Sequence, residues 1–401
     1  MPTNLLHASA EWATRPDDER FWTLDEMFSS ALQSCDESTQ WIGALADIQF
    51  CGSDSEVGIL LGEHQPDHLG VDPILMTNYA FGQMCRTLEA PASYLRSLPA
   101  STAAYCLGHG RQRWISANGI DATRQLLIHA GLGGGRLRAA TSERYVRVWN
   151  HEIISRLLEL QESGWRVPSA RPVAMDSPRT RIAEEEDVID YGSDSALTVK
   201  VGDVIGPAGL YASDHDMFAF LIHPDIEISD GESPGGLRRG TMIRQSEVGD
   251  CAIWKLDFLF NTVCGNHIVW GAENISETRV RHTGSEVGER WRGMVRAIDD
   301  YAQGSAADQE AKILEAKQTI LGDDKESVID FLFGKRLLGK RDAGDAFDMA
   351  ERFESVHGNP RSAWGLVQGI TRLSQATSHA DRRATLDMTA GRVLAHAIDL
   401  N

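Results

Sequence analysis

Residues 254–283, WKLDFLFNTVCGNHIVWGAENISETRVRHT, are the stretch around which we expect the middle of the chain to fold. The beginning of this stretch is apolar enough for a buried face, although its spacing does not separate helix from strand. Ile268 to Trp270 are strand-forming residues, and Thr278 to Arg281 alternates arginine with valine, as a half-exposed strand does. We therefore predict two strands joined by a polar loop, with Arg279 and Arg281 on one face.

Three residues of this stretch, Cys264, His267 and His282, carry side chains that could do chemistry. A cysteine nucleophile needs a nearby base, and either histidine could serve. The alternative is that Cys264 is a small buried hydrophobe and His267 a hydrogen-bonded interior or edge residue. The Cys264–His267 pair is at most half of a zinc site, because no second pair stands at a zinc-like spacing, so we predict no metal.

The charge of the chain is strongly acidic but uneven. A net charge of −19 over 401 residues argues against a surface that coats nucleic acid as a whole. Between residues 136 and 181, however, nine arginines stand against five acidic residues. Because salt screens charges over about 8 Å at physiological ionic strength, a local basic face remains compatible with the acidic total.

The location of the protein is predicted from what the sequence lacks. No run approaches the roughly 18 apolar residues of a membrane helix, and the first residues do not form a secretory signal. The six cysteines have irregular spacing, which favours free thiols in a reducing compartment. We predict a cytoplasmic protein without a membrane partner.

Four regions are expected along the chain: a flexible tail over 1–22, a mainly helical region over 23–124, an α+β core over 125–283 and a helical region over 284–401. The predicted fold class is α+β. A central, curved antiparallel sheet would run from about residue 125 to 282, with helices packed on it. Helices at both ends of the chain would flank this sheet.

A second informative stretch is TSERYVRVWN, residues 141–150. In a strand, Tyr145, Arg147 and Trp149 would share one face, and Asn150 would then cap a helix over 151–163. Aromatic rings interleaved with arginines suit single-stranded nucleic acid, because bases stack on the rings and arginines bind phosphate. The alternative is an ordinary sheet face that helices cover.

A third candidate is the polar sequence Asp214-His215-Asp216, which precedes an apolar strand. These side chains are capable of binding a metal. The alternative is a polar turn, since Asp side chains commonly bond to their own backbone in turns.

Five segments of the chain together resemble a known family. They are NYAFGQMCRTLEAPASYLRSLP, TSERYVRVWNHEII, LYASDHDMFAFLI, FLFNTVCGNHIVWG and VRHTGS, and the likeness as a whole covers roughly residues 40–300. This order is similar to that of the phage/plasmid-like protein family known as domain of unknown function 932. The motif core that the resemblance implies comprises Asp214, Asp216, Cys264, Asn266, His267 and His282. In much of the family a glycine stands where this chain has His267.

The resemblance implies a product of a mobile element and, by association, a role in DNA metabolism. The predicted strand–hairpin–strand–helix order over 125–163 is also similar to single-strand annealing proteins of the Rad52-like type. We therefore predict a non-enzymatic, cofactor-free, homo-oligomeric protein that binds or anneals single-stranded DNA. The predicted DNA-contacting residues are Arg136, Arg138, Arg144, Tyr145, Arg147, Trp149, Arg238, Arg239, Arg279 and Arg281.

Two alternatives come from other classes. The first is a metal-dependent hydrolase or nuclease that uses Asp214, His215 and Asp216 together with Cys264, His267 and His282. The second is a host-directed interaction protein, a hypothesis that rests on the acidic surface.

Overall fold

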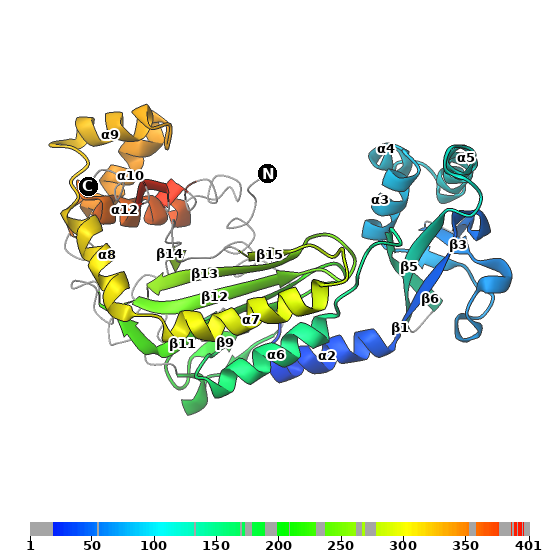
Figure 1. Ribbon diagram of the computed structural model, residues 1–401, viewed down its shortest axis with the longest axis horizontal. Helices are drawn as coiled ribbons and strands as arrows, with labels where there is room; N and C mark the ends of the chain where they lie inside the picture. The colour runs from blue at the N-terminus through cyan, green and yellow to red at the C-terminus, as the bar shows by residue number, and fades with distance from the viewer. Residues whose placement is uncertain are drawn as a thin grey trace.

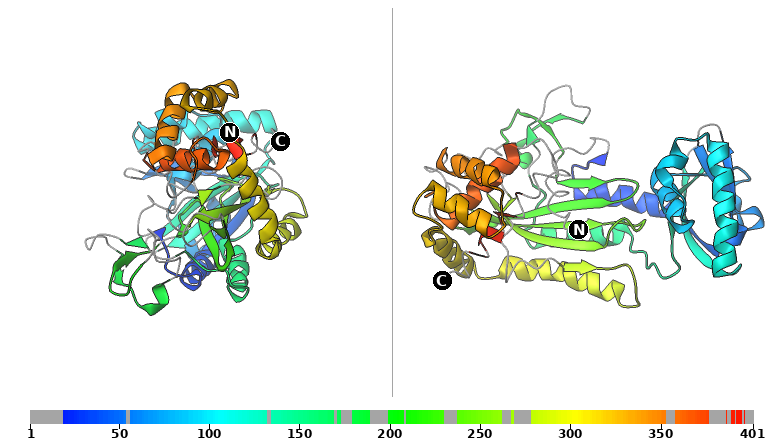
Figure 2. Two further views of the ribbon diagram at one scale, coloured as in Figure 1. Left: turned by 90° about the vertical axis from the view of Figure 1, so that its left-hand side faces the viewer. Right: turned by 90° about the horizontal axis from the view of Figure 1, so that it is seen from above.

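The computed structural model describes residues 19–53, 56–131, 134–168, 171–172, 179–188, 199–207, 209–229, 237–261, 267–268, 278–352, 358–376, 386, 389–390, 392–394 and 396. The protein is an α+β protein of elongated shape. Figures 1 and 2 show a sheet with its own helices at one end, a second sheet in the middle and a group of helices at the other end.

The N-terminal sheet contains six strands in the order β1-β5-β6-β4-β3-β2. The strands are β1 (Ser38–Ala44), β2 (Gln49–Ser53), β3 (Glu56–Leu60), β4 (Ile74–Met76), β5 (Thr123–Gly131) and β6 (Gly134–Thr141). All neighbours are antiparallel except β4 and β6, which are parallel. The associated helices are α3 (Asn78–Thr87), α4 (Ala92–Arg96) and α5 (Ala100–Asn118), which share one apolar core with the sheet.

The middle of the molecule is a second sheet of six strands. Its order is β10-β11-β12-β13-β14, and β15 also pairs with β13. The strands are β10 (Leu210–Ala212), β11 (Met217–Ile228), β12 (Leu237–Gln245), β13 (Ile253–Asn261), β14 (His267–Ile268) and β15 (Thr278–Val280). Three helices, α2 (Leu24–Asp36), α6 (Asn150–Glu162) and α7 (Val287–Gln303), lie along one face (Figure 1). Alternate residues of β11, from Met217 to Leu221, supply the apolar contacts to these helices.

A small third sheet has the order β7-β9-β8, from β7 (Arg171–Pro172), β8 (Arg181–Ile182) and β9 (Val204–Gly206). Short 3₁₀ helices lie at Leu45–Asp47, Gly62–His64, Asp67–Leu69 and Glu185–Asp187.

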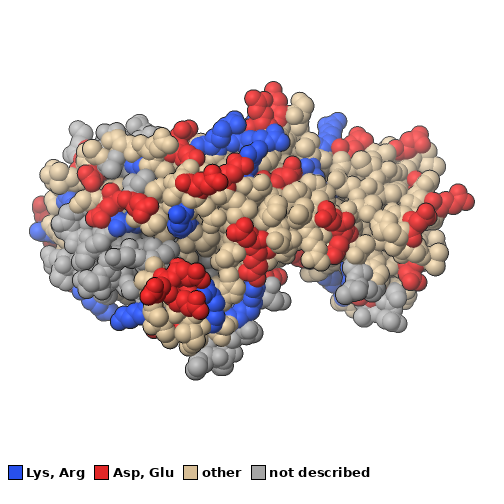
Figure 3. Space-filling model, turned by 90° about the horizontal axis from the view of Figure 1, so that it is seen from below, with Lys and Arg blue, Asp and Glu red and all other residues tan. Residues whose placement is uncertain are grey.

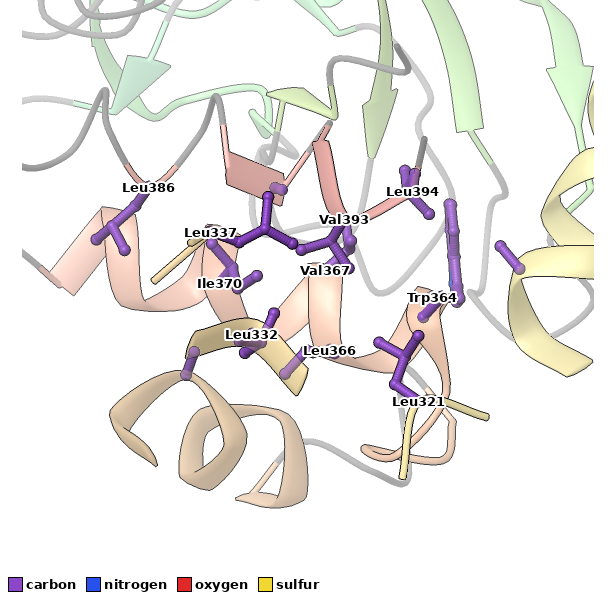
Figure 4. Packing of buried hydrophobic residues seen from close by; sticks show 14 of the residues in the cluster. Leu321, Leu332, Leu337, Trp364, Leu366, Val367, Ile370, Leu386, Val393 and Leu394 are labelled. Carbon is purple, nitrogen blue, oxygen red and sulfur yellow. The ribbon is translucent and has the colours of Figure 1, made fainter. Parts of the chain in front are cut away.

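The described elements after β15 and α7 are the helices α8 (Ala306–Gln318), α9 (Lys325–Gly334), α10 (Lys340–Arg352) and α12 (Ala363–Ala376), with one isolated bridge between Ile320 and Ser362. They pack around the fully buried Trp364 (Figure 4). A Cβ atom on Gly369 would overlap the carbonyl oxygen of Ala346, so this glycine allows the close approach of α12 to α10.

The structure differs from the predicted architecture in the number of sheets. The prediction of a single sheet over residues 125–282 is wrong, because β5 and β6 pair with β1 and β4, two strands of the region expected to be mainly helical. Residues 143–149 do not form the predicted strand either, since Glu143 and Arg144 are in a turn and only Tyr145 makes a bridge. The sheet boundary therefore falls in the segment after β6.

Candidate nucleic-acid interface

The segment that joins β6 to α6 is bound to the chain that follows β15. Tyr145 forms an antiparallel bridge with Thr283, and the backbone N–H of Val146 donates to the carbonyl of His282 at 2.7 Å. Nδ1 of His282 lies 3.0 Å from the carbonyl of Val146. This short pairing brings together two parts of the predicted binding surface that lie far apart in the sequence.

Arg147 and the rings beside it form an internal stack. The Arg147 guanidinium carbon lies 5.4 Å from the ring centre of Tyr145 and 5.9 Å from that of Trp149, and Nη1 donates to the carbonyl of Glu247. The His282 ring stacks on the Tyr145 ring, and the two ring centres are 4.9 Å apart. Tyr145, Arg147 and Trp149, which we predicted to share a face, therefore lie together. They are, however, already held by cation–π contacts with one another and by hydrogen bonds to the backbone of the protein.

The Tyr145 hydroxyl donates to the carbonyl of Ser246 at 2.8 Å, and burial raises the pKa of Tyr145. Burial also lowers the pKa of His282, which is only 5% exposed, and favours its neutral form. Both side chains are thus part of the packing between the two sheets.

Arg136 and Arg138, both predicted to bind phosphate, have separate ion-pair partners. Arg136 pairs with Glu56 at the surface. Arg138 stands at a β-bulge, where the register of β6 against β5 shifts, and its Nη2 lies 3.1 Å from Oε2 of Glu247. The Arg138 and Glu247 side chains are 8% and 2% exposed, so this pair is an interior ion pair and not a phosphate site.

A cleft of about 630 Å³ lies between the N-terminal sheet and the middle sheet. One wall is a single face of α2, with Met27, Ser30, Ala31 and Ser34 at helical spacing. Arg136, Arg138, His129, Asp214 and Glu247 are among its polar residues. The volume is in the range of ligand pockets, but the two arginines already have carboxylate partners.

Arg238 and Arg239 also point into the protein. Arg238 pairs with Glu227 at 3.3 Å and has a side chain that is 9% exposed. Arg239 is 1% exposed, donates to the carbonyl of Ala302 and lies over the ring of Tyr301. Their place in β12, a strand buried over nearly its whole length, removes both from any surface role.

The remaining predicted arginines, Arg144, Arg279 and Arg281, are exposed. The Arg279 guanidinium lies 6.0 Å from the ring centre of Trp254. Arg144 and Arg281 form no ion pair with any described residue, and they flank the short pairing of residues 145–146 with 282–283.

Helix α7 adds cations that the sequence analysis missed. Arg290, Arg292 and Arg296 are exposed, whereas the buried side of α7 carries Trp291 and Met294. Figure 3 shows Lys and Arg side chains gathered near the upper margin of that view, with acidic side chains beside them. A charge count would have found this group, since residues 279–296 contain five arginines and only two glutamates.

The Asp214-His215-Asp216 sequence forms a turn. Oγ of Ser213 accepts from the backbone N–H of His215 and of Asp216, each at 3.2 Å, as in a serine turn. His215 bonds Asp214 at 2.8 Å and stacks on Tyr79 of the N-terminal region, with ring centres 5.9 Å apart.

Asp216 is 1% exposed and pairs with Arg244 at 3.1 Å. Among the described residues no group of three or more potential ligands could hold a metal ion. Cys264 and Asn266 lie outside the described residues, and His267 is described only by its backbone in β14.

His215 should give stability a specific pH dependence. The hydrogen bond to Asp214 raises the pKa of His215, so its stabilising contribution is complete below the unfolded value near 6.5 and is lost as pH rises through the folded pKa. We expect the stability advantage of the wild type over His215→Gln to shrink over the pH range that begins near 6.5 and extends upward through the raised pKa of His215. Urea unfolding of both proteins across this range measures it, and a constant or growing difference would contradict the assignment.

Comparison of the chain with protein-family models, with curated proteins and with solved structures finds no match. The resemblance to the phage/plasmid-like family therefore stays a prediction. Over the part of the chain that is described, helices are too short or too polar to span a lipid bilayer.

Proposed function

We propose that the protein binds single-stranded nucleic acid through an arginine surface, which we define as Arg144, Arg279, Arg281, Arg290, Arg292 and Arg296. The observation that carries the proposal is the pairing of residues 145–146 with 282–283. It joins the two distant segments that carry the exposed Arg144 and Arg281, shortly before the start of α7.

Electrostatics supports this surface in spite of the acidic total. Arg144 and Arg281 have no carboxylate partner among the described residues, so their charge is available to phosphate oxygens. Of the other predicted arginines, Arg136, Arg138 and Arg238 already pair with carboxylates. Arg147 and Arg239 donate to backbone carbonyls inside the protein. Acidic residues more than a Debye length away weaken phosphate binding little.

A single strand is the preferred partner because the arginine surface is spread over a turn, a short strand and a helix, and because the α3–α4 helix pair does not suit a duplex groove. The helix pair α3–α4 ends in a helix of five residues, and its Arg96 is bonded to Asn78. Duplex readers commonly place a longer, basic helix in the major groove. A flexible single strand can instead follow cations that are displayed on a turn, a short strand and a helix. Annealing is the activity that we propose such binding serves.

The variant Arg144→Ala/Arg281→Ala tests the proposal. We expect at least a tenfold weaker affinity for labelled single-stranded DNA at low salt, because two charge-assisted bonds to phosphate are lost. The slope of log K against log salt should decrease by about 1.4, since each phosphate contact contributes about 0.7 on single strands. Fluorescence anisotropy at several salt concentrations provides both values.

The matched control is Arg156→Ala, because Arg156 is an exposed arginine on α6 that already pairs with Glu159. It should bind like the wild type. Equal binding by the double variant and the wild type would refute the arginine surface, and absent binding at low salt would refute the function. Cleavage of the DNA in the presence of magnesium would instead favour the hydrolase alternative. Salt-sensitive capture of a host protein would favour the interaction-protein alternative.

A further inference from the structure

Strand β1 forms an open edge of the N-terminal sheet. It is the terminal strand in the order β1-β5-β6-β4-β3-β2, and Figure 1 shows it at the margin of that sheet, where α2 leads into it. No strand among the described residues pairs with its outer side. Gln40 is exposed and Ile42 is 61% exposed, so side chains of this strand also face solvent.

The opposite edge of the same sheet is β2, and a helix crowds one face of this strand. Helix α5 packs on β2 so closely that a Cβ atom on Gly52 would overlap the backbone of Ser101. Within the described part of this sheet, β1 is therefore the less crowded of the two edges at which a further strand could be added.

The sequence of β1 has none of the usual protection of an edge strand. Edge strands commonly carry charges, prolines or bulges, which prevent pairing with other chains. Residues 38–44, STQWIGA, contain no charge and no proline, and their register with β5 is continuous from Ser38 opposite His129 to Ala44 opposite Thr123. The strand is thus regular, seven residues long and ready to accept hydrogen bonds on its free side.

We infer that β1 pairs antiparallel with β1 of a second copy of this chain, so that two six-stranded sheets become one continuous sheet across a two-fold axis. A neutral strand can pair with itself without bringing like charges opposite each other. In a pairing centred on Trp41, Ile42 would stand opposite Gln40 of the other copy. The net charge of −19 opposes self-association of the chain as a whole. Two copies therefore approach with the least electrostatic repulsion at a neutral edge.

This inference does not rest on the proposed nucleic-acid binding. The expected affinity follows from the small surface area that one added strand would bury, which is typical of weak interfaces. We expect a reversible monomer–dimer equilibrium with a dissociation constant on the order of micromolar to tens of micromolar.

Sedimentation of the full chain from about 1 to 200 µM tests the inference. The wild type should shift from monomer to dimer over this range. Ile42→Lys should remain monomeric, because it places charges in the paired strands. Val71→Lys is the matched control, since Val71 is 91% exposed in the same part of the chain but not on β1, and it should dimerise like the wild type.

Hydrogen exchange on the unaltered protein gives a second measurement that does not depend on the folding of any variant. Amides of residues 38–44 should become more protected as the concentration rises, whereas those of β2 should not change. A wild type that stays monomeric at every concentration overturns the inference. A dimer that Ile42→Lys leaves intact, or protection that rises elsewhere and not in β1, overturns it as well.

Discussion

Glu247→Ala is expected to lower the free energy of unfolding by about 3–5 kcal/mol, because it leaves the interior guanidinium of Arg138 without its carboxylate. Glu247 and Arg138 are almost completely buried, and they join the segment after β12 to the bulge of β6. Oε1 of Glu247 also accepts from the backbone N–H of Asn150, the first residue of α6, at 2.7 Å. The variant therefore removes partners from two elements at once, and urea unfolding followed by tryptophan fluorescence measures the loss.

Glu56→Ala is the matched control for this prediction. Glu56 also pairs with an arginine of β6, Arg136, but both side chains of that pair are more than 40% exposed. Exposed pairs contribute at most about 1 kcal/mol, so the control should unfold at nearly the urea concentration of the wild type. Similar losses in the two variants would show that burial of the Arg138–Glu247 pair does not matter.

Lys255→Met is the second variant with a large expected effect, again a loss of about 3–5 kcal/mol at neutral pH. Lys255 and Asp257 form an ion pair in β13, with side chains that are 1% and 2% exposed. They stand opposite Ile243 and Thr241 of β12, on the face that the helices cover. Methionine keeps much of the volume, but among the described residues it leaves the Asp257 carboxylate with the Thr241 hydroxyl, at 2.8 Å, as its remaining partner.

The loss from Lys255→Met should depend on pH in a defined direction. Burial raises the pKa of Asp257 from its usual value, and the charge of Lys255 opposes this rise. A raised pKa means that the contribution of this group is complete at acid pH and is lost as pH rises through the folded pKa. Without Lys255 the rise is unopposed, so the deficit of the variant should shrink as pH falls and Asp257 becomes protonated.

The double variant Lys255→Met/Asp257→Leu separates the two causes. It removes both charges and keeps apolar volume under the helices, so we expect it to recover most of the stability lost by the single variant or to exceed the wild type. Unfolding at pH 5 and pH 7.5 should show little pH dependence of that recovery. A double variant as unstable as the single one would mean that packing, not the unpaired carboxylate, causes the loss.

Elements with strong local periodicity were predictable from the sequence. A helix over 151–163 was expected and α6 spans Asn150–Glu162, because the apolar residues of this segment repeat at helical spacing and Gly164 ends it. The strand around Thr278–Val280 was likewise visible in its alternation. In both cases residues a few positions apart contain the whole signal.

Sheet membership was not visible in this way. Strand β4 has three residues, and β1 pairs with a strand about 85 residues later, so no local period marks either of them as part of the sheet with β5 and β6. The predicted single sheet failed for this reason. Strand pairing is a contact between distant segments, and a window on the sequence does not contain its partner.

The predicted arginines show the same difference between what local sequence reveals and what tertiary contacts decide. The sequence by itself determined that Arg136, Arg138 and Arg144 belong to one basic stretch and that Arg279 and Arg281 follow the apolar core strand. Only the tertiary structure decided which of them face solvent. Arg138 meets Glu247, a residue 109 positions away, whereas Arg144 meets no carboxylate among the described residues. The charge of a side chain is a local property, but its burial and its partner depend on segments that folding brings from elsewhere in the chain.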